Sequence, residues 1–319
     1  MPNNLVKIDE YDKKLLYELD KDAHTTISAL TKKLKKSKQF IDYRIKRLEE
    51  EKIILAYQAI IDSSKLGFIT YRIYIKFQQM TKEDEFIEFL KNYENIWTIA
   101  RLHGKWDFAF FIGVKNIREL HETWDKLTLK FKSKIKEYDI AVYAPIINHN
   151  RTFFTDKKLD KIDRIYGDGN KLEYDEIDLK IIKEYSTNVR TAYIDIAKKL
   201  DLSINTIINR IKILEKKKII CGYKLDINLE PLGYEGYRVD LHLNSKEKIR
   251  SLREYCKQSR NIYQIMDTIG GADFEMSVIV KDFYDLLRLM KDMQMKFPEI
   301  DYYEYFGYSL FARLSYVPD

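Results

Sequence analysis

Basic residues crowd a short stretch of the chain, directly before a segment with helical periodicity. The cluster consists of Lys32, Lys33, Lys35, Lys36 and Lys38. Beyond it, Ile41, Ile45 and Leu48 repeat at spacings of four and three, which places them on one stripe of an α-helix. Ser37 can accept hydrogen bonds from first-turn amides and so begin that helix. Because lysines neutralise phosphates and polar side chains on a helix can read base edges, this stretch indicates contact with DNA.

The same pattern occurs a second time at a fixed offset of 166 residues, the difference 203 − 37 between Ser203 and Ser37. The offset continues without a gap far beyond the helix, through the pairs Gly67 and Gly233, Gly104 and Gly270, and Asp107 and Asp273. A period of this length is too long for a solenoid repeat. The sequence therefore contains two copies of one whole unit.

Polar residues on the two helices are the candidates for DNA contact. In the first copy they are Lys32, Lys33, Lys35, Lys36, Ser37, Lys38, Gln39, Tyr43 and Lys46. In the second copy they are Ser203, Asn205, Thr206, Asn209 and Lys212. Asp42 counts against the first set, because a carboxylate in the groove must accept from a cytosine amine or turn away. Ile208, at the equivalent place in the second copy, could contact a thymine methyl or mark a helix that has lost part of its DNA contact. The alternative is a solvated charged face on a helical interaction domain.

Each copy is expected to fold into three helices, an exit strand and an α/β unit. Arg44 and Arg210 are expected to bridge acidic residues of the first helix, such as Asp12 and Asp178, rather than bases. After the exit strand the pattern alternates as strand, helix, strand, strand, helix and strand. Residues 68–79 read as a half-buried strand, with Ile73 and Ile75 on its buried face and Arg72 and Tyr74 on its open face. This order predicts a ferredoxin-like βαββαβ sandwich. The fold class is therefore α+β, with two winged-type helix-turn-helix domains and two such sandwiches.

Composition shifts suggest where these parts meet. The first helix-turn-helix domain is expected over residues 1–57 and its sandwich over 58–147. A polar, turn-rich linker follows over 148–172, and its Gly167-Asp168-Gly169-Asn170 run favours turns. The second helix-turn-helix domain is expected over 173–223 and the second sandwich over 224–319. Ser245 and Asp282 are expected to cap the two helices of that sandwich.

Bulk properties exclude several classes of protein. The hydrophobic fraction of 45% supports real cores, and the net charge of +6 permits a polyanionic partner without demanding one. Cys221 and Cys256 have no paired spacing and read as reduced thiols. No stretch suits export or a membrane span, so a cytoplasmic protein is expected. The five histidines are scattered, and no metal, cofactor or catalytic site is predicted.

The ordered set of residues resembles the Lrp/AsnC, or feast/famine, family of transcriptional regulators, over nearly the whole chain and twice. The first copy matches at Asp12, Leu34, Ser37, Arg44-Ile45, Leu48-Glu49, Tyr57, Leu66-Gly67 and Gly104-Lys105-Trp106-Asp107. The resemblance implies a DNA-binding regulator whose sandwich domains pair and respond to an amino-acid effector. It would place ligand contacts at Gly104, Asp107, Gly270 and Asp273, although a Gly and Asp pair also suits a tight hairpin.

The second copy departs from the family at its effector loop, where Ala272 replaces an aromatic residue. Lys52 and Lys218 stand where the family usually has the glycine that ends the third helix, so a different cap chemistry is expected there. Tandem copies suggest that both halves of the usual dimer come from one chain, with pairing inside the chain or in a homo-oligomer both open. Two recognition helices on one side would then read half-sites about one DNA turn apart, or a multiple of it.

Two other functions stay open from the sequence. Sirohaem decarboxylases resemble the same architecture, but they carry a His-Asn-Tyr cluster that is missing from the equivalent segment, Ile96–His103. The second alternative is an assembly module whose helix-turn-helix units contact other protein rather than DNA.

Overall fold

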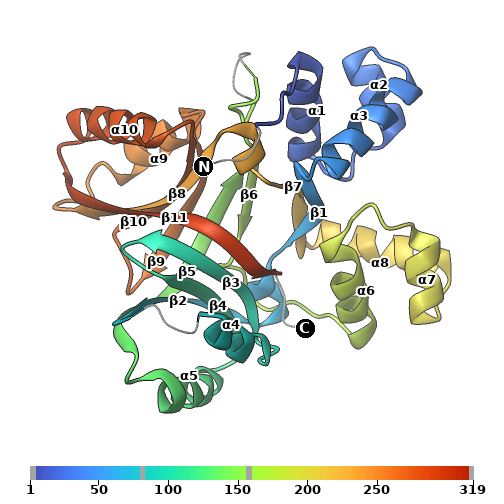
Figure 1. The fold of residues 1–319 in the computed structure, drawn as a ribbon. Coiled ribbons are helices and arrows are strands. Elements are labelled where there is room, and N and C mark those ends of the chain that lie inside the picture. The colour runs from blue at the N-terminus through green and yellow to red at the C-terminus, as the bar shows by residue number, and fades with distance from the viewer. Residues whose placement is uncertain (1–4, 80–82, 156–159, 316–319) are drawn as a thin grey trace.

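Each half of the chain folds into a three-helix head, a connecting strand and a βαββαβ unit (Figure 1). The computed structural model describes residues 5–79, 83–155 and 160–315. The first head contains α1 (Glu10–Lys21), α2 (Ile27–Leu34) and α3 (Lys38–Glu50). The second head contains α6 (Glu176–Thr187), α7 (Tyr193–Leu200) and α8 (Ile204–Lys216). The two heads therefore repeat the same elements, as the internal duplication predicts.

The heads begin their helices with the side chains that favour helix starts. Asp9 and Asp175 each form a capping box with the acidic residue three positions later, Asp12 or Asp178. Serines at the starts of α3 and α8 accept a hydrogen bond from a first-turn amide in both copies. The apolar stripes of both heads pack into one continuous core that also includes side chains from the connecting strands.

The ends of α3 and α8 correct one expectation. Lys52 and Lys218 adopt left-handed backbone conformations, with φ of 53° and 56°. The cap geometry that glycine usually provides is thus retained, and lysine accepts a conformation that costs an L-residue about 1 kcal/mol. The backbone N–H of Lys52 donates to the carbonyl of Glu49, and that of Lys218 to the carbonyl of Glu215.

The two sandwich units have the predicted βαββαβ order. The first unit contains β2 (Ile69–Phe77), α4 (Glu83–Lys91), β3 (Ile96–Gly104), β4 (Phe108–Val114), α5 (Ile117–Phe131) and β5 (Ile135–His149). The second contains β8 (Glu235–Leu243), α9 (Ile249–Gln258), β9 (Ile262–Ile269), β10 (Phe274–Val280), α10 (Phe283–Lys296) and β11 (Ile300–Leu314). Asp282 caps α10 as predicted, but Ser245 does not cap α9, which begins at Ile249; its hydroxyl accepts from Glu247 N instead.

The sheets of the two units join at both edges. Strand β3 pairs with β11 on one side, and β5 pairs with β9 on the other, so eight strands form a closed ring. This closure is possible because β5 and β11 are 15 residues long, and each pairs first within its own sheet and then with the other sheet. The helices lie outside the ring (Figure 1). The inner sheet faces lie against each other, and the Tyr74 ring of the first unit contacts the Phe306 ring of the second.

This closure overturns the expectation of a half-buried strand at residues 68–79. Arg72 and Tyr74, expected on an open face, are buried, at 1% and 2% exposure. The alternation predicted the face that packs on α4 and α5, but it could not reveal that a second sheet covers the other face. The two sandwich units thus pair within one chain.

The connecting strands form a separate two-stranded ribbon. Strands β1 (Ile54–Ile61) and β7 (Ile220–Ile227) pair antiparallel, with Tyr57 opposite Leu225 and Ala59 opposite Tyr223. Short 3-10 turns at Ser63–Leu66 and Glu230–Leu232 then lead into the sandwich units. Because one strand comes from each half, the ribbon ties both heads to each other as well as to the ring.

The segment between the halves is not a structureless linker. Within residues 148–172, β6 (Asp163–Tyr166) pairs with the end of β5. The carboxylate of Asp20 on α1 accepts from the backbone N–H and from Nη1 of Arg151, at 2.5 and 2.6 Å. Arg164 of β6 donates to the carbonyls of Asp20 and Lys21. The segment therefore fastens the first head to the closed ring.

Asp20→Ala should destabilise the protein strongly, because the buried side chain and the backbone N–H of Arg151 would both lose the carboxylate that accepts from them. A loss of about 3–5 kcal/mol is expected for breaking such a pair, measured as the free energy of unfolding in urea. Ser186→Ala is the matched control, since Ser186 is the buried equivalent of Asp20 in the second copy. Ser186→Ala should lower the free energy of unfolding by only about 1 kcal/mol. Equal losses for the two variants would contradict the conclusion that Asp20 fastens the first head to the ring.

Candidate DNA-binding surface

The polar face of α3 is exposed where the sequence predicts base contact. Ser37 accepts a hydrogen bond from Phe40 N at 3.2 Å and so holds the start of the helix. Gln39, Tyr43 and Lys46 point away from the core, and Tyr43 is 64% exposed. Asp42 forms an ion pair with Lys46 at 2.9 Å, so it lies beside this face and offsets part of its positive charge.

The clustered lysines lie in the last turn of α2, in the turn that follows it and at the first residue of α3. Lys32, Lys35 and Lys38 are exposed and form no ion pair within the part of the chain that the structure describes. Lys33 pairs with Glu18 at 2.8 Å. The Nζ atom of Lys36 lies 4.4 Å from the centroid of the Tyr11 ring, which fixes its position without neutralising it. The first head thus presents positive charge around an exposed helix N-terminus, an arrangement that favours anions.

The second head repeats the geometry with less charge. Ser203 accepts from Thr206 N at 3.0 Å, and its hydroxyl also contacts the Thr206 hydroxyl, so these two predicted contact residues serve the helix start. Asn205, Asn209 and Lys212 are exposed, as the prediction requires. Three lysines of the first copy have no equivalent here, because Asp201, Leu202 and Ile204 occupy the positions of Lys35, Lys36 and Lys38.

The predicted structural role of the two helix arginines is confirmed. Arg44 Nη1 donates to Asp9 and Asp12 at 2.6 and 2.9 Å. Arg210 Nη1 donates to Asp175 and Asp178 at 2.6 and 3.2 Å. The hydrogen bond from Asp178 N, together with the Arg210 guanidinium, lowers the pKa of Asp175. These bridges fix each recognition helix against the first helix of its head.

The bridges of the two heads differ in one cation. Arg47 also donates to Asp12, at 2.5 Å, whereas Ile213 occupies the equivalent position in the second copy. The buried carboxylate of Asp12 therefore has two cationic partners, but Asp178 has only one among the ion pairs of the described residues.

The heads also contact each other, which the sequence did not reveal. The His24 ring lies 5.2 Å from that of Tyr223, and Arg190 lies over the Tyr57 ring at 4.2 Å. These contacts are equivalent under the duplication, since Arg190 and Tyr223 correspond to His24 and Tyr57. Tyr193 OH adds a hydrogen-bond contact to His24 Nε2 at 3.2 Å. No periodicity marks such residues; comparing the two copies across a two-fold axis is the only signal that could have found them.

The Gly and Asp loops are placed at strand ends of the sandwich units. Asp107 accepts from Phe77 N at 2.8 Å and from Lys76 Nζ at 2.7 Å. Asp273 makes the equivalent bond with Leu243 N at 2.9 Å and pairs with Lys246. Gly104 and Gly270 have positive φ, of 110° and 93°, so the hairpin chemistry is present in both loops. A role of these four residues in effector binding stays a prediction.

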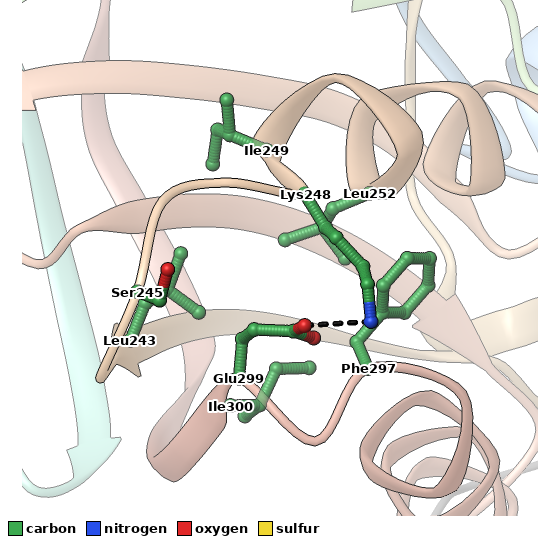
Figure 2. A pocket seen from close by; sticks show the side chains of 8 residues that line it. All are labelled: Leu243, Ser245, Lys248, Ile249, Leu252, Phe297, Glu299 and Ile300. Carbon is green, nitrogen blue, oxygen red and sulfur yellow. Dashed lines mark ion pairs between the residues drawn. The ribbon is translucent and has the colours of Figure 1, made fainter.

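A crevice near the second loop is too small for an effector in this form. Figure 2 shows it between the start of α9 and the loop after α10, where Lys248 and Glu299 form an ion pair of 2.7 Å across its mouth. Leu252, Phe297 and Ile300 line its floor. It encloses about 10 Å³, which barely holds one water molecule.

Comparisons with known proteins agree with this geometry. The family profile of winged helix-turn-helix DNA-binding domains matches residues 8–54 and 174–220, one match in each head. An HTH-type transcriptional regulator of Pyrococcus furiosus is 30% identical over 122 residues, which cover 38% of this chain and 82% of the relative. The regulator LrpA of Pyrococcus horikoshii is 30% identical over 118 residues, covering 37% of this chain and 84% of LrpA. The relatives thus correspond to single copies of the duplicated unit.

One solved structure matches both copies together. The siroheme decarboxylase NirDL superimposes with a TM-score of 0.64 at 13% identity, over 97% of this chain and 94% of that chain. At this identity the likeness concerns the fold alone, including the arrangement of two heads on paired sandwiches. The sequence matches in turn define the class: the chain belongs to the Lrp/AsnC family of helix-turn-helix transcriptional regulators. No helix among the described residues is long and apolar enough to cross a membrane.

Arg210→Ala should cost more stability than Arg44→Ala, because Asp178 would lose its one arginine while Asp12 would keep Arg47. We expect a loss of about 1–3 kcal/mol for Arg210→Ala and roughly half of that for Arg44→Ala, measured by urea denaturation at neutral pH. The lowered pKa of Asp175 makes its contribution present above the ordinary value of 3.8 and lost as the pH falls below it. The Arg210→Ala effect should therefore shrink in that acidic range; a loss that is independent of pH would contradict the bridge.

Proposed function

We propose that this protein binds double-stranded DNA with both heads and regulates transcription. The observation that carries the proposal is the pair of exposed recognition helices held in one rigid frame. Each has a polar face directed to solvent, and each is anchored from behind by the arginine bridge to the first helix of its head. Family membership supports the same function. The regulator itself needs no catalytic group, and it would act in the cytoplasm.

The spacing of the two heads is set by the protein rather than by the DNA. Both heads lie on the same side of the closed ring (Figure 1). Three sets of contacts oppose independent movement of the heads: the β1 and β7 ribbon, the contacts of His24 and Arg190, and the clamp formed by the bonds from Arg151 to the Asp20 carboxylate. Such a frame suits two half-sites about one turn of DNA apart, roughly 34 Å, or a multiple of that distance.

The two heads would divide the work unequally. The first head supplies most of the phosphate attraction, because its five clustered lysines have only two counterparts in the second head, Lys198 and Lys199. The second head offers Asn205 and Asn209, side chains that can bind adenine bidentately, and Ile208, which suits a thymine methyl. We therefore infer that the first head positions the protein and that the second adds sequence preference.

An amino-acid effector acting through the sandwich units is a finer part of the proposal, and it rests on the family resemblance. The loop carboxylates Asp107 and Asp273 already bind backbone N–H groups. An effector ammonium would therefore compete with the lysines at these carboxylates, Lys76 and Lys246, rather than enter an open cavity. Binding there could alter the strand ends and thereby the assembly of the ring.

Lys36→Ala combined with Lys38→Ala should weaken binding to every duplex, because both lysines lie at the start of α3 and would neutralise phosphates. The slope of log affinity against log salt concentration should fall by about 0.9 for each phosphate that is no longer neutralised, measured by fluorescence anisotropy. Lys126→Ala with Lys291→Ala is a control of equal charge change, on helices α5 and α10 outside the ring. If the Lys36→Ala and Lys38→Ala variant had the same affinity and the same salt dependence as this control, the assignment of DNA binding to this surface would be contradicted.

Selection of bound duplexes from a random pool should enrich a motif in two parts, because two helices at fixed separation must each contact DNA. Asn205→Ala with Asn209→Ala should erase the preference in one part and leave the salt slope nearly unchanged. Enrichment of a single half-site by the unmodified protein would contradict reading by two heads.

The two alternatives make predictions that differ from those of the regulator. An assembly module would show no salt-dependent binding to duplex DNA or to heparin. A sirohaem enzyme would bind added sirohaem with a shift of its absorbance bands, and the full-length likeness to NirDL makes this titration worth performing. Failure to bind any duplex at low ionic strength would refute the regulator directly.

A further inference from the structure

The interior of the closed ring contains charged side chains that the proposed function does not use. Arg72, Arg238, Asp240 and Glu275 are all at most 5% exposed. Glu275 joins the two sandwich units, since its Oε1 accepts from Arg72 Nη2 at 2.7 Å and its Oε2 accepts from Arg238 Nη2. Arg238 Nε also donates to Asp240 at 3.1 Å. Two guanidinium cations and two carboxylates therefore compensate one another away from water.

Comparison of the two copies shows that these buried charges balance only when the first sandwich unit faces the second. The two arginines are equivalent to each other, at positions 72 and 238, but the carboxylates come from the second unit alone. Ala109 is equivalent to Glu275, and Tyr74 is equivalent to Asp240. Two first units would bury two cations here with neither of these carboxylates, and each arginine would keep only Asp139 of its own unit. Two second units would bury two cations with four carboxylates. Asp139, which also binds Arg72, is partly exposed and lies at the edge of this cluster.

The close packing around Gly271 also requires that unlike units face each other. Gly271 lies beside the Arg72 guanidinium, and a Cβ at this position would lie 2.4 Å from both Arg72 Nη2 and Glu275 Oε1. The equivalent residue of the first unit is Lys105. A first unit in the place of the second would thus bring a third cation and a steric overlap to the position of the guanidinium.

The seam between β3 and β11 adds a third unlike contact. Lys105 Nζ forms an ion pair with Glu304 of β11. The residue equivalent to Glu304 in the first unit is Tyr138, and the residue equivalent to Lys105 in the second is Gly271. Like units would therefore place Lys105 against Tyr138, or Glu304 against Gly271, and neither combination would form this pair.

We propose that the two sandwich units are obligate unlike partners, so that each unit accepts the other copy and rejects its own kind. The partner that this surface fits is a sheet with Arg238, Asp240, Gly271 and Glu275 opposite a sheet with Arg72, Ala109 and Lys105. An unpaired buried charge costs more than an ideal pair gains, and so the cluster acts mainly by penalising wrong partners. Chains of this protein therefore do not associate by pairing two first units or two second units with each other. The inference is independent of DNA binding.

Glu275→Ala in the full-length chain tests the interior, because it introduces the residue that the first unit carries, Ala109, and removes the carboxylate that binds both arginines. The unfolding midpoint should fall by about 10 °C, measured by circular dichroism. Ile73→Val is the matched control: it also introduces the residue that the other copy carries, at the buried position next to Arg72, and should cost about 3 °C. A midpoint for Glu275→Ala as high as that of Ile73→Val would overturn the proposal.

Charge reversal at the seam provides a test that leaves the interior intact. Lys105→Glu and Glu304→Lys should each lower the midpoint by about 2–4 °C, since each places like charges together on half-buried side chains. The double variant restores an opposite pair and should recover at least half of the summed loss. Additive losses in the double variant would show that the seam does not select its partner, and would overturn the proposal as well.

Discussion

The length of two strands governs the architecture. Strands β5 and β11 each extend beyond their own sheet and pair with an edge strand of the other unit. An edge strand that stays unpaired exposes a row of backbone donors and acceptors to any passing chain. Here both edges are closed within one polypeptide, so the ring needs no second chain to complete it. The heads depend on this closure, because the ribbon, β6 and the clamp on Asp20 are all attached to strands of the ring.

Rigidity of the frame has a direct consequence for recognition. A regulator whose two readers move independently pays an entropic cost when both must bind at one separation. In this protein the equivalent contacts of His24 with Tyr223 and of Arg190 with Tyr57 hold the heads together across an approximate two-fold axis. The apolar core runs without interruption from one head to the other. The separation of the recognition helices is thus a property of the fold, present before any DNA is bound.

Local patterns in the sequence predicted the parts of the fold but not their assembly. Periodicity and capping residues located α3 and α8, and the strand and helix order predicted both βαββαβ units. The alternation of residue types placed Arg72 and Tyr74 on an exposed face, but both are buried. A face with polar and aromatic residues is predicted to contact solvent unless the sheet that covers it is known. The same limit applies to the site: Gln39 and Asn209 could be selected as exposed polar residues on a helix, whereas the hydrogen bond between Tyr193 and His24 joins residues 169 positions apart. Contacts over such separations leave no periodic trace in a single sequence.

The two copies have diverged in ways that a homodimer would not permit. In a homodimer every substitution appears on both sides of the axis, so a carboxylate gained opposite an arginine is gained twice. Fusion removes that constraint, and Glu275 can then serve both Arg72 and Arg238 from one side. The heads differ in the same way, because Asp201, Leu202 and Ile204 near the start of α8 occupy the positions of three lysines near the start of α3. Because the scaffold fixes which copy faces which, the charge and the polar surface of one head can differ from those of the other without disturbing the pairing of the sandwich units.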